Sequence, residues 1–190
     1  LKEVKCFGST EKKINLLDFE LTQEPLEKLS DYDEGYFDLL LNFAFLTEDK
    51  LVLYSEEEFK YQNSKLINFI TNEVYRLKVR HVVTISSGAV YRNREKQNSY
   101  GDMKIYEENK FKSLAKDGKT QVVIPRLFNL SGPFINKMDR YMISSLISQG
   151  FLNNEIKIFS DRKVFRSFLD IKEFILTFLS TFKPGHKGFA

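Results

Sequence analysis

The chain has 190 residues, of which 42% are hydrophobic and 29% charged, and this is enough to build one sizeable hydrophobic core. The formal net charge is +3, but Lys and Arg alternate with Asp and Glu along the chain, which argues against nucleic acid as the main partner. No apolar run reaches the length of a membrane span, and the one cysteine, Cys6, cannot form an internal disulfide, so we expect a cytoplasmic protein.

The first half of the chain alternates short apolar runs with a helical pattern. A capping box of Ser55 and Glu58 opens a helix that is predicted to continue to about Lys78. The third of the predicted strands is apolar enough to be covered on both faces. These strands are Glu3–Phe7, Ile14–Phe19 and Phe37–Phe45.

The second half repeats this alternation. Asp170 and Glu173 open a final helix. Alternating strands and helices predict right-handed βαβ units and a doubly wound, parallel α/β sheet. The predicted elements are a strand at Arg80–Ser86, a helix at Ser99–Lys116, a strand at Thr120–Phe128, an amphipathic segment at Asp139–Gln149 and a short strand at Ile156–Phe159.

Polar side chains that can take part in a chemical reaction follow the strand that contains His81. Ser86 and Ser87 lie at its carboxyl end, where doubly wound sheets bind ligands. Tyr100 and Lys104 are four residues apart and therefore share one helix face. An ammonium near a phenol lowers the pKa of that phenol, so that it can exchange a proton with a hydroxyl or carbonyl group, while Ser87 hydrogen-bonds the same oxygen. This arrangement predicts oxidation of an alcohol or reduction of a ketone with a nicotinamide cofactor.

A Tyr-x-x-x-Lys pair by itself usually marks only a surface helix. Five segments in order resemble the extended short-chain dehydrogenase/reductase family of nucleotide-sugar epimerases and dehydratases. They are "LLLNFAF" with Asn63 downstream, "VVTISSGAVY", "YGDMKIYEE", "VIPRLFNLSGP" and, more loosely, "FRSFLDIKEF".

This resemblance implies a Rossmann-like fold and a role for each matched residue. Residues 1–133 would form the cofactor-binding region, and 134–190 part of a small substrate-binding subdomain, with the chain passing between the two. Ser87 would hydrogen-bond the reacting sugar oxygen, and Tyr100 would be the acid/base. The other implied roles are Lys104 at the nicotinamide ribose, Ala44 and Phe128 against the cofactor, Ser9 near its adenosine ribose, and Asn129 and Arg166 on the sugar nucleotide.

Without the resemblance, Arg166 is about as well explained as a solvated surface arginine as by a role in ligand binding. The family also commonly forms homodimers through a four-helix bundle, here 55–78 and 99–116 from each subunit, in which Tyr106 and Phe111 would be buried. The implied cofactor is NAD or NADP. An acidic residue at 8–10 would favour NAD and an arginine would favour NADP, but the sequence there is "GST" and has neither. No metal is implied.

The chain departs from the family pattern at its beginning. The family opens with a strand and a Gly-x-x-Gly-x-x-Gly loop that holds the cofactor pyrophosphate, and the 9 glycines here do not have that spacing. The loop between Tyr91 and Tyr100 is also short for the family. These gaps fit either the ordered part of a longer enzyme or a degenerate relative that has lost its cofactor.

Two functions follow from these patterns. The first is a nucleotide-sugar epimerase or 4-ketoreductase, because Gly88 and Ala89 replace the Asp-Glu pair with which family dehydratases eliminate water. The second is a cofactor-free binding or scaffold protein with the same fold. A nucleic-acid binder, suggested only by the pI of about 8.8, is the weakest reading.

Overall fold

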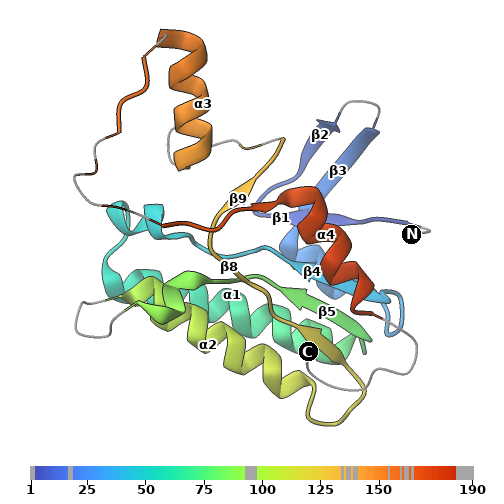
Figure 1. Ribbon diagram of the computed structural model, residues 1–190. Helices are drawn as coiled ribbons and strands as arrows, with labels where there is room; N and C mark the ends of the chain where they lie inside the picture. The colour runs from blue at the N-terminus through green and yellow to red at the C-terminus, as the bar shows by residue number, and fades with distance from the viewer. Residues whose placement is uncertain are drawn as a thin grey trace.

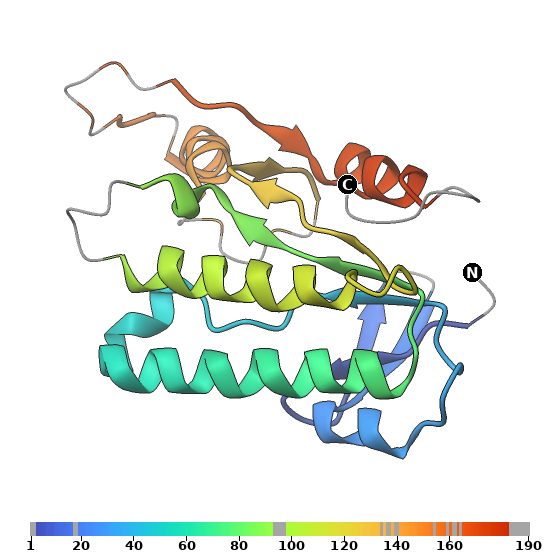
Figure 2. The same ribbon diagram turned by 90° about the horizontal axis from the view of Figure 1, so that it is seen from below.

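The computed structural model describes residues 3–16, 19–92, 98–133 and 135–182, except for 136, 137, 139, 140, 154, 159, 161, 162 and 164. Helices α1 (Glu56–Arg76) and α2 (Ser99–Leu114) lie side by side on one face of the central strands (Figure 1). Helix α4 (Ile171–Ser180) lies on the opposite face (Figure 2). The molecule therefore has the helix–sheet–helix layers that the sequence predicts.

The central sheet is parallel. Its strands β4 (Leu39–Asn42), β5 (His81–Thr84) and β7 (Gln121–Val123) have the order β4-β5-β7. Shorter parallel pairs follow: β6 (Ser86–Ser87) with β8 (Arg126–Leu127), and β9 (Leu130–Ser131) with β10 (Leu169–Asp170). The α/β fold with parallel, doubly wound strands is confirmed.

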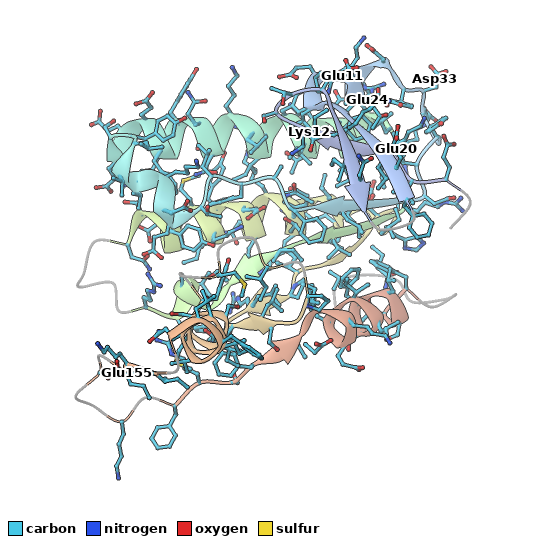
Figure 3. The ribbon with its side chains drawn as sticks, turned by 90° about the horizontal axis from the view of Figure 1, so that it is seen from above. Glu11, Lys12, Glu20, Glu24, Asp33 and Glu155 are labelled. Carbon is cyan, nitrogen blue, oxygen red and sulfur yellow. The ribbon has the colours of Figure 1, made fainter. Side chains whose placement is uncertain are left out.

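The N-terminal strands form a separate three-stranded sheet in which β1 (Cys6–Gly8) is parallel to β3 (Phe19–Pro25). Strand β2 (Lys12–Leu16) is antiparallel to β3, so the prediction of a single strand at 14–19 is wrong. Leu17 and Asp18, between these two strands, lie outside the described residues. Charged side chains such as Glu11, Lys12, Glu20 and Glu24 surround this hairpin, far from Glu155 (Figure 3).

Three other expectations differ from the structure. Strand β4 pairs only with β5 among the described strands. Leu40 packs against the core under α1 and α2 and Leu39 against the cluster under α4, but Leu41 is exposed, so the strand is only partly covered. Residues 156–158 form no strand, and Phe159 lies outside the described residues. Helix α3 spans Met142–Asn153, whereas the amphipathic segment is predicted at 139–149. Asp139 also lies outside the described residues.

Most of the core lies between the sheet and helices α1 and α2. The fully buried side chains there include Phe59, Ile67, Val74, Val82 and Phe111. Burying each of these removes roughly 1.5–3 kcal/mol of unfavourable exposure to water. A smaller cluster of Val83, Val123, Phe174 and Phe178 packs under α4.

The termini of the helices follow local sequence signals. The side chain of Ser55 accepts a hydrogen bond from the backbone N–H of Glu58 at 3.2 Å, which confirms the predicted start of α1. Asp170 caps α4 in the same way through Lys172 and Glu173. Among the described residues, none of the helices combines the length and apolarity needed to cross a membrane.

Candidate active site

Asn98 connects the start of α2 by hydrogen bonds to the segment that follows β6. Its side chain accepts a hydrogen bond from the N–H of Gly101 at 3.1 Å and donates one to the carbonyl of Ala89 at 2.9 Å. A Cβ at position 101 would lie 2.7 Å from that carbonyl oxygen, so glycine permits this close approach. The contact brings the first turn of α2 against the short 3-10 helix η3 (Gly88–Tyr91), and with it Tyr100 toward Ser87.

At the carboxyl end of the parallel strands, the side chain of Ser87 lies close enough to the Tyr100 hydroxyl to influence its pKa through a hydrogen bond. Burial raises the pKa of Tyr100, the Ser87 hydrogen bond opposes this rise, and the negative charges of Glu107 and Glu48 add to it. The pKa of Tyr100 is therefore raised and not lowered as expected, because burial is the largest influence on it. Tyr100 therefore rests in its protonated form.

The ammonium of Lys104 makes three contacts inside the protein. It donates to the carbonyl of Ile85 at 2.8 Å and to Oε2 of Glu107 at 2.8 Å, and it lies 3.7 Å from the centre of the Phe45 ring. The ring of Phe45 also packs edge-on against Tyr100. Lys104 is thus held beside Tyr100, with its charge compensated by Glu107.

Glu107 is the centre of a buried polar network. Its Oε1 accepts hydrogen bonds from Asn42 at 2.9 Å and from Thr84 at 2.8 Å, and Asn42 also donates to Thr84. These partners come from β4 and β5, so the network ties α2 to the carboxyl ends of two strands. Burial lowers the pKa of Lys104 and raises that of Glu107, and the charge of each partner opposes the shift of the other.

A second carboxylate, Glu108, joins α2 to β6 and β8. It accepts hydrogen bonds from Ser86 at 2.6 Å and, in a bidentate pair, from Arg126 at 2.7 and 2.6 Å. Burial acts to raise the pKa of Glu108, but the hydrogen bonds from Arg126, Ser86 and Lys112 outweigh it and lower the pKa to about 2. The Ser86 hydrogen bond holds β6, the strand that carries Ser87, against the helix that carries Tyr100, and the Arg126 pair holds the neighbouring β8.

Phe128 presents a flat aromatic surface next to η3. Its ring is exposed and stacks on Tyr91 with 6.0 Å between ring centroids. A Cβ on Gly88 would lie 2.4 Å from the Phe128 ring, so glycine allows the two segments to meet. The hydroxyl of Tyr91 accepts a hydrogen bond from Arg126 at 2.6 Å.

The structure also brings together Asn129 and Arg166, which are 37 residues apart in the sequence. Arg166 Nη1 lies 3.5 Å from Oδ1 of Asn129, and Asn129 donates to the carbonyl of Ser167 at 3.1 Å. Arg166 is exposed and Asn129 is partly buried. They form a polar pair beside β9 and β10.

Ala44 lies in the turn after β4, where its N–H donates to Asn42 at 3.1 Å. Asn63 holds the same turn by accepting from Leu46 N–H at 2.9 Å. Ser9 is exposed immediately after β1, in the separate N-terminal sheet. Within the described ranges, no group of three His, Cys, Asp or Glu side chains is placed to hold a metal ion.

Sequence reasoning missed two neighbours of Lys104. Glu107 is three residues from Lys104, and this spacing on one helix face is a signal for an ion pair that could have been used. Phe45 had no such signal, because its contact with Lys104 depends on how the turn after β4 meets α2. The two residues change the surroundings of the predicted lysine but not its location.

Comparison with known proteins places these features in context. A model described as the NAD dependent epimerase/dehydratase family matches residues 4–183. No curated protein gives a significant match.

Several solved structures share the fold. "MoeE5 in complex with UDP-glucose and NAD" has a TM-score of 0.71 and 19% identity over 93% of this chain and 64% of its own. RMD from Pseudomonas aeruginosa complexed with NADPH has a TM-score of 0.67 and 20% identity over 89% of this chain and 67% of its own. Helicobacter pylori ADP-L-glycero-D-manno-heptose-6-epimerase has a TM-score of 0.69 and 21% identity over 86% of this chain and 55% of its own. At this identity the likeness establishes the fold, and the chain spans less than two thirds of the length of the first and third of these structures.

Proposed function

The chain belongs to the NAD-dependent epimerase/dehydratase family, and from that premise we propose that it is an NAD(P)-dependent nucleotide-sugar epimerase or 4-ketoreductase. The observation that carries this proposal is the proximity of the Ser87 and Tyr100 side chains at the carboxyl ends of parallel strands, with Lys104 and Tyr100 both in contact with the ring of Phe45. These side chains can bind one oxygen atom and exchange a proton with it.

In the proposed reaction, Tyr100 transfers the proton. Its hydroxyl donates to a ketone oxygen during reduction, or its phenolate accepts the proton of a sugar hydroxyl during oxidation. Ser87 hydrogen-bonds the same oxygen and holds it within reach. A bound nicotinamide supplies or accepts the hydride. An epimerase returns the hydride to the opposite face of the sugar, whereas a reductase stops after one transfer.

The residues around Tyr100 suit the nicotinamide end of NAD or NADP. Lys104 offers an ammonium to a ribose hydroxyl, Ala44 is a small residue in the adjoining turn, and Phe128 offers an exposed ring. Ser9 is the proposed neighbour of the adenosine ribose. Among the solved structures of this fold, one contains NAD and another NADPH, which supports this class of cofactor without selecting one.

The sugar nucleotide is proposed to bind near Asn129 and Arg166. The exposed guanidinium of Arg166 suits the oxygens of a diphosphate, and Asn129 lies against it at 3.5 Å. The segment after Ser87 favours an epimerase or reductase over a dehydratase. Gly88 and Ala89, which occupy that segment, have no side-chain group that transfers a proton.

A cofactor-free binding protein is the second candidate, and one observation favours it. The ammonium of Lys104 already contacts the Glu107 carboxylate, the Ile85 carbonyl and the Phe45 ring. Its side chain is only 7% exposed, which limits the access of a ligand.

We also propose a homodimer built from the outer faces of α1 and α2. Tyr61 and Tyr75 are exposed on α1 and lie 14 residues apart, about four helical turns, on one side of the helix. Phe111 does not belong to that surface, because it is fully buried in the subunit's own core, and Tyr106 is only partly exposed. The expectation that Phe111 is exposed before dimerisation is therefore wrong.

A substrate screen tests the proposed function. The protein is incubated with UDP-, dTDP-, GDP- and CDP-sugars and with NAD, NADH, NADP or NADPH, and products are identified by chromatography and mass spectrometry. An epimerase interconverts two sugars without net use of cofactor, whereas a reductase consumes NADH or NADPH in proportion to product. Binding of a sugar nucleotide without conversion under any of these conditions would support the binding protein instead.

A further inference from the structure

We propose that Glu107 is a positioning residue of this site: its carboxylate is the counterion that holds Lys104 as an ammonium, fixed between the end of β5 and the ring of Phe45. The consequence for catalysis rests on the function proposed above. The ion pair itself is tested independently of that function.

The geometry around Glu107 leaves its carboxylate little freedom. The side chain of Glu107 is 2% exposed and that of Lys104 is 7% exposed, with 2.8 Å between Oε2 and Nζ. The other oxygen, Oε1, accepts from Asn42 and Thr84 on two neighbouring strands. With both oxygens bonded, the carboxylate is held at the point where it meets the ammonium.

A lysine at this depth needs a compensating charge. Removing an ammonium from water disfavours its charged form, and an opposite charge nearby restores it. The groups that contact Lys104 from outside α2 are the Ile85 carbonyl and the Phe45 ring, and both are neutral. Asn42 and Thr84, which are neutral as well, bond to Glu107 instead. On α2 itself, the negative charge of Glu108 also acts on Lys104, but Glu108 is itself paired with Arg126. Glu107 is therefore the direct counterion of Lys104 among the described residues.

The positive charge of Lys104 determines how its side chain interacts with the Phe45 ring. An ammonium lying 3.7 Å from the centre of the Phe45 ring is attracted to that ring, whereas a neutral amine is not. Two of its three N–H groups are used by Ile85 and Glu107, so one remains for a ligand hydroxyl. Burial is the main cause of the raised pKa of Tyr100, and the carboxylate of Glu107 adds to that rise.

Nuclear magnetic resonance of the protein labelled with ¹⁵N at lysine Nζ tests this proposal. Buried, hydrogen-bonded ammonium groups exchange slowly enough to be observed, and Lys104→Met identifies the signal of Lys104. In Glu107→Gln, the titration midpoint of Lys104 is expected to fall by about one to three pH units, because an opposite charge within about 4–6 Å shifts a pKa by that much. An unchanged midpoint in Glu107→Gln would overturn the proposal.

Glu73→Gln is the matched control. Glu73 is another buried glutamate in an i,i+3 ion pair, with Arg76 at 2.6 Å, but it lies in α1. This change is expected to leave the Lys104 midpoint where it is in the wild type. A shift of equal size in Glu73→Gln would show that general loosening of the helices, and not a specific counterion, controls Lys104.

A second variant covers the case in which Glu107→Gln does not fold. The double variant Lys104→Met/Glu107→Gln removes both charges and is then expected to fold, as circular dichroism and cooperative unfolding would show, because no uncompensated ammonium remains. If the double variant also fails to fold, an uncompensated ammonium is not the cause of the failure, and the proposal is wrong.

Activity separates this inference from the proposed function. If the Lys104 midpoint falls as expected but the wild type converts no sugar nucleotide, the ion pair stands and the enzymatic function fails. If sugar nucleotides are converted but the midpoint is unchanged, the function stands and the role of Glu107 fails.

Discussion

The hydroxyl groups of Ser87 and Tyr100 are the atoms on which the proposed proton transfer depends. Ser87→Ala removes the hydrogen bond that lowers the pKa of Tyr100, so this pKa is expected to rise further. In the oxidative direction, the pH at which the rate reaches half its maximum should move upward, and turnover should fall about tenfold to a hundredfold. A pH profile of kcat/KM measures both effects.

Ser86→Ala is the control for this prediction. The neighbouring hydroxyl donates to Glu108 at 2.6 Å and does not belong to the proposed acid/base pair. Its pH profile should have the same midpoint as that of the wild type. Overlapping profiles for Ser87→Ala and the wild type would show that Ser87 does not act on Tyr100.

Glu108 predicts how the stability of the fold depends on pH. Its pKa is about 2 in the folded protein against 4.5 for the ordinary group, so the unfolded state takes up its proton first as the pH falls. The stabilisation is fully present above about pH 4.5 and is lost as the pH falls toward about 2. Urea unfolding of the wild type should show this loss.

Glu108→Gln should remove that part of the acid dependence. Around neutral pH the change should cost about 2–3 kcal/mol of unfolding free energy, because it takes a buried partner from the half-exposed guanidinium of Arg126. The control Glu155→Gln changes an exposed carboxylate and should alter stability by less than about 0.5 kcal/mol. Equal acid sensitivity of Glu108→Gln and the wild type would contradict the prediction.

At the scale of elements, sequence patterns located the helices better than the strands. The capping signals of Ser55 and Asp170 act within a few residues, and α1 and α4 begin where they predict. The β2–β3 hairpin was predicted as one strand, because an apolar run does not reveal where the chain reverses. The exposure of β4 also depends on its neighbours in the sheet, which are not encoded in its own residues.

The proposed homodimer belongs to the same scale. Tyr61→Asp on the exposed side of α1 should convert a dimer into a monomer, because it places a charge in a closed two-fold interface. Sedimentation velocity at micromolar concentration measures the change. Leu176→Asp, at an exposed site on α4 in the opposite layer, should leave the dimer intact. A monomeric wild type would refute the interface.

At the scale of the whole molecule, the fold gathers residues that lie far apart in the sequence. The Tyr-x-x-x-Lys spacing and the serines after β5 were enough to predict Ser87, Tyr100 and Lys104 as one group, because the end of a parallel strand and the following helix meet at the same edge. The pairing of Lys104 with Glu107 and the direction of the Tyr100 pKa were not predicted. Both depend on burial, which exists only after β4, β5 and α2 have packed together.

The central claim is that Tyr100 transfers the proton in a reaction on a nucleotide sugar, and Tyr100→Phe tests it most directly. The variant keeps the ring and its contact with Phe45 but removes the hydroxyl. Tyr106→Phe is the control, because it makes the same change on the same helix, where the hydroxyl donates only to Asn68.

The measurement is kcat with the sugar nucleotide found in the screen, at cofactor concentrations raised until the rate saturates. We predict a fall of about a hundredfold or more for Tyr100→Phe, with the unfolding midpoint nearly unchanged, and a rate close to that of the wild type for Tyr106→Phe. A Tyr100→Phe variant that turns over its sugar nucleotide as fast as the wild type would contradict the claim.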